Sequence, residues 1–290
     1  MRLSVSVTNY SWPHREIRAR LAALADTLDD SAVDTLWVAD HILQADPSSR
    51  LDEPMLEAYT ALGFLAARTS RLRLGTMVTA ATFRAAALLI KAVTTLDVLT
   101  DGRAWLGIGA GYNADEARAM GLFMPATAER FTRLTELLRL AQQMWSGDDR
   151  PFRGDYLELE HPIGSPRPIA RPRPPVLIGG TGERRTLRLV AEYGDACNLF
   201  DVPDGGQAIR RQLDVLARHC ADVGRPVDEV ERTVSTALEP RETVDEFARR
   251  CATLGDLGID HAVVIVRGRP WTPEALATVT DAAARLAATG

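Results

Sequence analysis

Cysteine and lysine are scarce in this chain of 290 residues. The shortage of cysteine bears on disulfides and zinc sites, and the shortage of lysine bears on the base composition of the genome. The three cysteines, Cys197, Cys220 and Cys251, are odd in number and show no CxxC spacing. This pattern argues against a disulfide framework and against a structural zinc site, so we expect buried, reduced thiols. Lys91 is the only lysine, and this bias towards arginine indicates a G+C-rich genome rather than a function.

The sequence also lacks the motifs of several common enzyme classes. Its five histidines form no HxH pair, which argues against a metallohydrolase barrel, and no metal site is predicted. There is no GxSxG nucleophile motif. The first apolar run leads into residues 9–13 without the glycines of a dinucleotide-binding fingerprint.

Long hydrophobic runs and excess basic charge are absent as well. No stretch approaches eighteen uninterrupted apolar residues, and residues 1–7 alternate like a strand rather than a signal peptide. A net charge of −5 argues against a nucleic acid or an anionic membrane as the main partner. We therefore expect a cytoplasmic protein that acts on a small molecule.

Eight apolar strand-like runs recur along the chain, and a segment with helical periodicity follows each one. The strands are predicted at 3–8, 35–39, 72–78, 104–109, 176–179, 196–200, 232–236 and 262–266. The helices are predicted at 16–29, 57–68, 85–99, 127–145, 183–192, 206–223, 243–254 and 273–287. This alternation predicts a (β/α)8 TIM barrel, as one domain over residues 1–290, and a doubly wound open sheet is the alternative.

Proline, arginine and glycine concentrate between residues 146 and 175, before the fifth predicted strand. So many prolines exclude a helix and favour an extended path over the surface. Because the strand–helix alternation resumes unchanged afterwards, we interpret this segment as an insertion in the barrel.

The second predicted strand ends in Asp40 and His41, two ionisable residues at the position where α/β enzymes carry their chemistry. An unpaired buried aspartate costs several kcal/mol, so Asp40 needs a partner or a ligand. Histidine is the side chain that most often serves as a general acid or base near neutral pH. We interpret His41 as a candidate acid or base that Asp40 orients or polarises; an ordinary turn is the alternative.

Two glycine-rich segments follow later strands. Gly179, Gly180, Thr181 and Gly182 join a strand to a helix, and six arginines but one glutamate lie between residues 167 and 188. This pattern predicts a phosphate site, with a plain turn as the alternative. Glycines at 107, 109 and 111 indicate that another chemical group packs closely against the backbone here. A crowded corner of the barrel that needs small residues is the alternative.

The segments 37–41, 72–78, 95–111 and 175–180 together resemble the bacterial luciferase-like oxidoreductases. Residues 53–58 and 196–200 resemble the branch of that family that uses the deazaflavin coenzyme F420 instead of FMN. The resemblance implies a barrel that holds the cofactor ring at its C-terminal mouth and the phosphate at 179–182. It also implies a cis peptide bond between Met77 and Val78.

The expected cofactor-binding residues are Asp40, His41, Thr76, Met77, Val78, Gly109, Ala110, Gly111, Tyr112, Asn113, Gly179, Gly180, Thr181 and Gly182. The expected catalytic residues are His41, Asp40 and Tyr112. Tyr10, Trp12, Asn198 and Phe200 are expected to line the substrate pocket.

The resulting hypothesis is an F420-dependent oxidoreductase that transfers a hydride between the deazaflavin and a small organic substrate, working as a homodimer. An FMN-dependent monooxygenase is the alternative, and a non-catalytic cofactor-binding barrel is a minor one. Tyr112 stands where the sugar-phosphate dehydrogenases of the branch carry an acidic residue, so glucose 6-phosphate is not an expected substrate.

Overall fold

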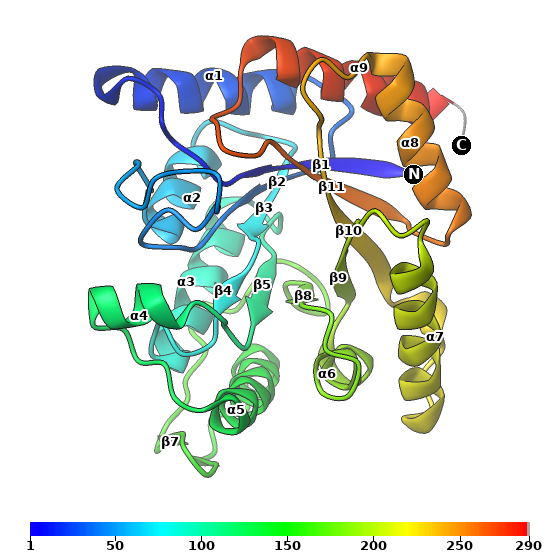
Figure 1. Ribbon diagram of the computed structural model, residues 1–290. Coiled ribbons are helices and arrows are strands. Elements are labelled where there is room, and N and C mark those ends of the chain that lie inside the picture. Colours follow the sequence, from blue (N-terminus) through cyan, green and yellow to red (C-terminus); the bar gives the residue numbers. More distant parts are fainter. Residues whose placement is uncertain (289–290) are drawn as a thin grey trace.

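A nine-stranded parallel sheet forms the centre of the computed structural model, which describes residues 1–288 (Figure 1). Its strands are β1 (Arg2–Val7), β2 (Thr35–Val38), β3 (Arg73–Thr76), β4 (Thr79–Ala80), β5 (Leu106–Gly109), β8 (Val176–Gly179), β9 (Ala196–Phe200), β10 (Glu231–Ala237) and β11 (His261–Ile265). They lie in the order β3-β2-β1-β11-β10-β9-β8-β5-β4. A parallel bridge links Leu74 of β3 to Ala104, two residues before β5, so the sheet is nearly closed into the predicted barrel.

The third predicted strand is divided in two. β3 pairs with β2, whereas β4 pairs with β5, and the cis peptide bond between Met77 and Val78 lies between them. The cis bond that the family resemblance implied is therefore present. Eight strand positions, one of them divided, account for the nine strands of the sheet.

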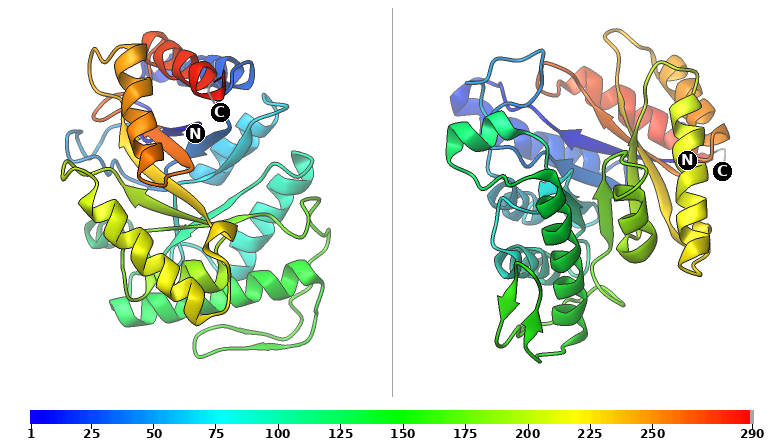
Figure 2. Two further views of the ribbon diagram at one scale, coloured as in Figure 1. Left: turned by 90° about the vertical axis from the view of Figure 1, so that its right-hand side faces the viewer. Right: turned by 60° about the horizontal axis from the view of Figure 1, so that its bottom comes forward.

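Helices surround the sheet (Figure 2). They are α1 (Ile17–Asp29), α2 (Ala58–Ala66), α3 (Ala86–Leu99), α4 (Ala114–Met120), α5 (Thr127–Ser146), α6 (Thr186–Tyr193), α7 (Gln207–Asp222), α8 (Val244–Asp256) and α9 (Pro273–Ala288), with short 3-10 turns at His14–Glu16 and Val227–Glu229. All eight predicted helices are present, and α4 is an additional one. Residues 289 and 290 of the predicted single domain lie outside the described part of the chain. No helix within residues 1–288 combines the length and the apolar character that crossing a membrane requires.

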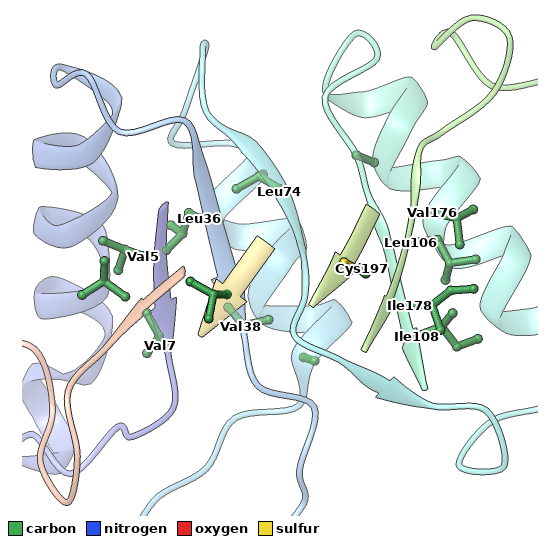
Figure 3. Close-up of a cluster of buried hydrophobic side chains, with 14 of the residues drawn as sticks. Val5, Val7, Leu36, Val38, Leu74, Leu106, Ile108, Val176, Ile178 and Cys197 are labelled. Carbon is green, nitrogen blue, oxygen red and sulfur yellow. The ribbon is translucent and has the colours of Figure 1, made fainter. Parts of the chain in front are cut away.

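Strand side chains alternate between the helices and the barrel interior. Val5, Leu36 and Ile108 belong to the large core under the helices (Figure 3). Trp37 and Trp105 face the interior, where their ring centroids lie 5.7 Å apart. The three cysteines are buried and free, as the sequence predicted.

The predicted insertion is anchored by two buried carboxylates. Glu136 of α5 accepts hydrogen bonds from the amides of residues 155–157, at distances of 2.6 to 3.3 Å. Asp97 of α3 accepts from the amides of Ile169 and Ala170. Residues 147–175 contain no helix, as the prolines predicted, but they include a hairpin of β6 (Phe152–Arg153) and β7 (Glu158–Leu159) that the sequence did not predict.

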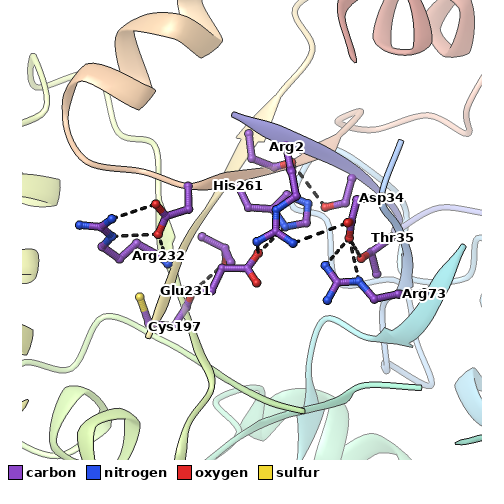
Figure 4. A network of polar contacts seen from close by, with 12 residues as sticks. Arg2, Asp34, Thr35, Arg73, Cys197, Glu231, Arg232 and His261 are labelled. Carbon is purple, nitrogen blue, oxygen red and sulfur yellow. Dashed lines mark hydrogen bonds and ion pairs between the residues drawn. The ribbon is translucent and has the colours of Figure 1, made fainter. Parts of the chain in front are cut away.

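A network of ion pairs closes the N-terminal end of the barrel (Figure 4). Glu231 pairs with Arg2 at 2.8 Å and with His261 Nδ1 at 2.7 Å, and Asp34 pairs with Arg73. The two carboxylates are partly buried, and each has a basic partner. In TIM barrels this end contributes to stability, and the opposite edge carries the active site.

Candidate functional site

The carboxyl ends of the parallel strands meet at one edge of the barrel. Asp40 and His41 follow β2, residues 110–113 follow β5, and residues 180–182 follow β8. The predicted catalytic and cofactor-binding residues therefore share the edge that carries the active site in TIM-barrel enzymes.

His41 is held by a carboxylate that the sequence analysis did not identify. Its Nδ1 lies 2.7 Å from Oε2 of Glu116, which is in α4 and has a fully buried side chain. Its Nε2 lies 3.4 Å from the hydroxyl of Tyr112, and the two rings meet edge to face. The prediction that Asp40 orients His41 is wrong in this respect, since Glu116 occupies that position.

Glu116 also fixes the loop that follows β2. Its Oε1 accepts hydrogen bonds from the amides of Ile42 at 2.6 Å and Leu43 at 3.1 Å. Burial raises the pKa of Glu116, but the hydrogen bonds from His41 and these two amides outweigh burial, so its pKa lies below the usual value. The carboxylate is thus ionised beside His41 at neutral pH.

One sequence signal for Glu116 exists. Asn113 caps α4 by accepting from the Glu116 amide at 3.1 Å, and a capping residue followed three positions later by glutamate is typical of a helix start. However, α4 has only seven residues and little apolar periodicity, so the signal predicts an exposed turn rather than a buried carboxylate.

Asp40 has its own partner, as its burial required. Arg84 Nη2 donates to Asp40 Oδ1 at 2.9 Å, Nη1 binds the other oxygen, and Thr79 donates to that oxygen at 2.6 Å. Arg84 also pairs with Glu57 and stacks on the ring of Tyr59. Asp40 is therefore the centre of a buried ion-pair cluster beside His41.

The predicted pocket residues Tyr10 and Trp12 lie in the hydrophobic core. Tyr10 is fully buried, and its hydroxyl has no hydrogen-bond partner among residues 1–288. Burial and the charge of Asp40 raise its pKa. Trp12 Nε1 donates to the carbonyl of Trp271 at 3.1 Å. Their role in a substrate pocket stays a prediction.

The other two predicted pocket residues differ in exposure. Asn198 is buried and its amide is used by β10, since it donates to Ser235 at 2.9 Å and accepts from Thr233 at 2.9 Å. Phe200, two residues further on at the end of β9, is 50% exposed. Of the pair, Phe200 has the side chain that is free to contact a ligand.

Glycines within β5 and β8 accommodate the divided third strand. A Cβ at Gly109 would lie 3.1 Å from a methyl group of Val78, and one at Gly179 would lie 3.0 Å from two of its methyl groups. A Cβ at Gly107 would lie 1.7 Å from the carbonyl oxygen of Thr76. Thr76 and Val78 therefore crowd these three glycines. This fits the crowded-corner alternative for Gly107 and Gly109, whereas the alternative for Gly179 is a plain turn.

The turn after β8 has the properties of an anion site. The amide of Gly180 is bonded to the carbonyl of Asn198, but within residues 1–288 the amides of residues 181–185 have no acceptor. They precede α6, which begins at Thr186, three residues later than predicted. Free amides at a helix N-terminus, with Arg184 and Arg185 beside them, fit a phosphate group.

The edge therefore combines a histidine with a fixed tautomer, a neighbouring phenol and a potential phosphate cradle. Because Nδ1 faces a carboxylate, Nε2 of His41 is the nitrogen left to exchange a proton with a ligand. No group of three or more metal-binding side chains occurs among the described residues. The arrangement suits proton transfer to or from a bound organic molecule.

Curated relatives match a large part of this chain. It is 38% identical over 164 residues to an F420-dependent glucose-6-phosphate dehydrogenase of Kineococcus radiotolerans, a match that covers 56% of this chain and 48% of that protein. It is 30% identical over 223 residues to the enzyme of the same name from Amycolatopsis mediterranei, covering 75% and 64%. The matches thus span about half to two thirds of the relatives' lengths.

Solved structures share the fold at low sequence identity. The monooxygenase RslO1 from Streptomyces bottropensis superposes with a TM-score of 0.83 at 17% identity, covering 100% of this chain and 99% of that one. An F420-dependent secondary alcohol dehydrogenase gives 0.78 at 15% identity, covering 98% of each chain. The family profile described as luciferase-like monooxygenase matches residues 1–258. The chain therefore belongs to the luciferase-like monooxygenase family.

Proposed function

We propose that this protein is a coenzyme F420-dependent oxidoreductase acting on a small organic substrate. The observation that carries the proposal is the pairing of His41 with Glu116 on the same barrel edge as the unbonded amides of residues 181–185. One feature suits proton transfer and the other suits a cofactor phosphate. The F420-dependent relatives support the choice of the deazaflavin.

Each predicted cofactor-binding residue has a role in this proposal. The backbone amides of Thr181 and Gly182 would bind the phosphate, and Gly180, whose own amide is bonded to Asn198, would shape the turn. Thr76, Met77, Val78, Gly109 and Gly179 would form the wall behind the ring, and Ala110, Gly111, Tyr112 and Asn113 would flank it. The deazaflavin, when bound, supplies the two-electron redox chemistry.

The protein's own contribution is to position the substrate and to move a proton at His41 Nε2. Glu116 keeps Nδ1 protonated, and the Tyr112 hydroxyl, 3.4 Å from Nε2, is a second group for hydrogen bonding to the substrate. Asp40, paired with Arg84, contributes a buried negative charge near the ring rather than a proton.

An FMN-dependent monooxygenase remains the second candidate, because RslO1, a monooxygenase, has the same fold. A non-catalytic cofactor-binding barrel is the minor alternative, and the polar edge around His41 argues against it. The predicted homodimer and the cytoplasmic location stay predictions, and sedimentation equilibrium would test the first.

An anaerobic hydride-transfer assay on His41→Ala tests the proposal. General acid–base groups typically contribute about 10² to 10⁴ in rate, so we expect a loss in that range. His14→Ala, a change of an exposed histidine at the start of the first 3-10 turn, is the matched control and should keep the full rate. A full rate in His41→Ala would remove His41 from the mechanism.

A further inference from the structure

The turn of residues 181–185, which carries the unbonded amides, contacts α7 through His219. Nε2 of His219 lies 2.8 Å from the carbonyl oxygen of Glu183, and α7 packs against α6, the helix that follows the turn (Figure 1). A carbonyl oxygen only accepts hydrogen bonds, so Nε2 carries the proton and is the donor. Within residues 1–288 this carbonyl receives no other hydrogen bond. The position of the Glu183 carbonyl therefore depends on one donor from a neighbouring helix.

The His219 ring makes no second hydrogen bond among the described residues. Its Nδ1 is buried without a hydrogen-bond partner, and Oδ2 of Asp222 lies 4.0 Å from it. Asp222 is 62% exposed and also faces Arg188 at 3.8 Å. The ring is therefore oriented by the Glu183 carbonyl, whereas His41 is oriented by a carboxylate. This difference suits His219 to holding the backbone rather than to exchanging a proton.

The hydrogen bond from His219 sets the direction of the next amide. The peptide bond between Glu183 and Arg184 is trans, and in a planar trans peptide the C=O and the N–H point in opposite directions. Because the carbonyl is turned to α7, the Arg184 N–H points away from α7. The turn is fixed again one residue later, since Cζ of Arg185 lies 5.4 Å from the centroid of the Phe131 ring in α5. The Arg184 amide thus lies between two anchored residues.

We propose that His219 is a positioning residue for the cofactor phosphate, and that it adds the Arg184 amide to those of Thr181 and Gly182 as a phosphate donor. This inference rests on the proposed function, because it takes the phosphate to bind at this turn. Residues 179, 180 and 182 are glycine, so the backbone here has many accessible conformations on its own. A hydrogen bond that restricts the turn before the ligand arrives reduces the entropy that binding costs.

Arg211, about two turns earlier on α7, contacts the same residue through its side chain only. Nε of Arg211 donates to Oε1 of Glu183 at 2.7 Å, and the Arg211 side chain is 65% exposed. Exposed ion pairs contribute little to stability. A contact with the carboxylate also leaves the direction of the peptide plane unset. Arg211→Gln is therefore the matched control for changes at His219.

Titration with two ligands tests the proposal. F420 would be compared with its phosphate-free 5-deazariboflavin chromophore, by quenching of their fluorescence on the purified protein. His219→Phe keeps a ring without a donor, and we expect it to weaken F420 binding about three- to tenfold, the usual effect of one lost hydrogen bond, with binding of the chromophore unchanged. His219→Gln, whose amide can donate from a similar position, should restore most of the affinity for F420. Arg211→Gln should bind both ligands like the unchanged protein.

Unchanged F420 affinity in His219→Phe would overturn the proposal, and so would equal weakening of F420 and the chromophore, which shows a structural role only. If His219→Phe fails to fold, His219→Ala removes the same donor and carries the same expectations. If the unchanged protein binds F420 no more tightly than the chromophore, the phosphate does not bind at this turn and the inference is wrong. If FMN binds and F420 does not, the proposed function is wrong, and FMN against riboflavin then tests His219 in the same way.

Discussion

His41 Nδ1 lies 2.7 Å from Glu116 Oε2, which joins the end of β2 to a short helix 75 residues further along the chain. The other oxygen of the same carboxylate binds the amides of Ile42 and Leu43. One buried group therefore sets both the tautomer of the histidine and the path of its loop.

We predict that Glu116→Gln lowers hydride transfer about tenfold or more while the bound cofactor remains. The amide can still accept from the loop amides, but it cannot provide the charge that stabilises a protonated His41. NMR of the His41 ring nitrogens should report a mixture of tautomers in this variant. A single Nδ1-protonated tautomer with an unchanged pH–rate profile would show that Glu116 has a structural role only.

The stability contributed by Glu116 should depend on pH. Its folded-state pKa lies below the unfolded value of about 4.3, so the contribution is complete above that pH and is lost as the pH falls through the folded pKa. Urea unfolding at pH 7 should show Glu116→Gln less stable than the unchanged protein by roughly 1–3 kcal/mol. The difference should shrink at pH 3, and a constant difference would contradict the assigned pKa shift.

Gly107→Ala should be severely destabilising. Its Cβ would lie 1.7 Å from the backbone oxygen of Thr76, so β5 would have to move away from the divided strand, at an expected cost of at least about 3 kcal/mol. Gly63→Ala is the control, because no atom lies within 4 Å of that Cβ and the residue is inside α2. It should stabilise by roughly 0.5–1 kcal/mol in denaturant unfolding. Equal effects of the two changes would disprove the packing argument.

Removing Arg84 should reveal how much the unpaired, buried carboxylate of Asp40 lowers the free energy of unfolding. Arg84→Met leaves the carboxylate without its main partner, and we expect a loss of about 3–5 kcal/mol in unfolding free energy. Adding Asp40→Asn should recover part of this loss, because a neutral amide is cheaper to bury. A double variant that is as unstable as the sum of the two single changes would show that the residues do not interact.

The barrel could be predicted from the sequence because its strands are short apolar runs that alternate with amphipathic helices. The run at residues 72–78 also predicted a strand, but its apolar pattern does not reveal where the strand divides. That division depends on how Thr76 and Val78 fit against the glycines of β5 and β8, which is a contact between distant parts of the chain.

Only part of the candidate site could be predicted, again because contacts between distant parts of the chain are not visible in the sequence. A strand end that carries Asp40 and His41 is visible in sequence, and so is the need for partners. The identity of those partners is not visible, because Arg84 is in a loop and Glu116 in a seven-residue helix, and neither belongs to a periodic pattern. Only the fold brings Arg84 to Asp40 and Glu116 to His41.

The central claim is that this barrel edge binds the deazaflavin, and equilibrium titration of the purified protein with F420 and with FMN tests it most directly. Quenching of cofactor fluorescence would give both dissociation constants under one set of conditions. We predict that F420 binds at least about tenfold more tightly than FMN, a difference of about 1.4 kcal/mol. Tighter binding of FMN would contradict the account and favour the monooxygenase.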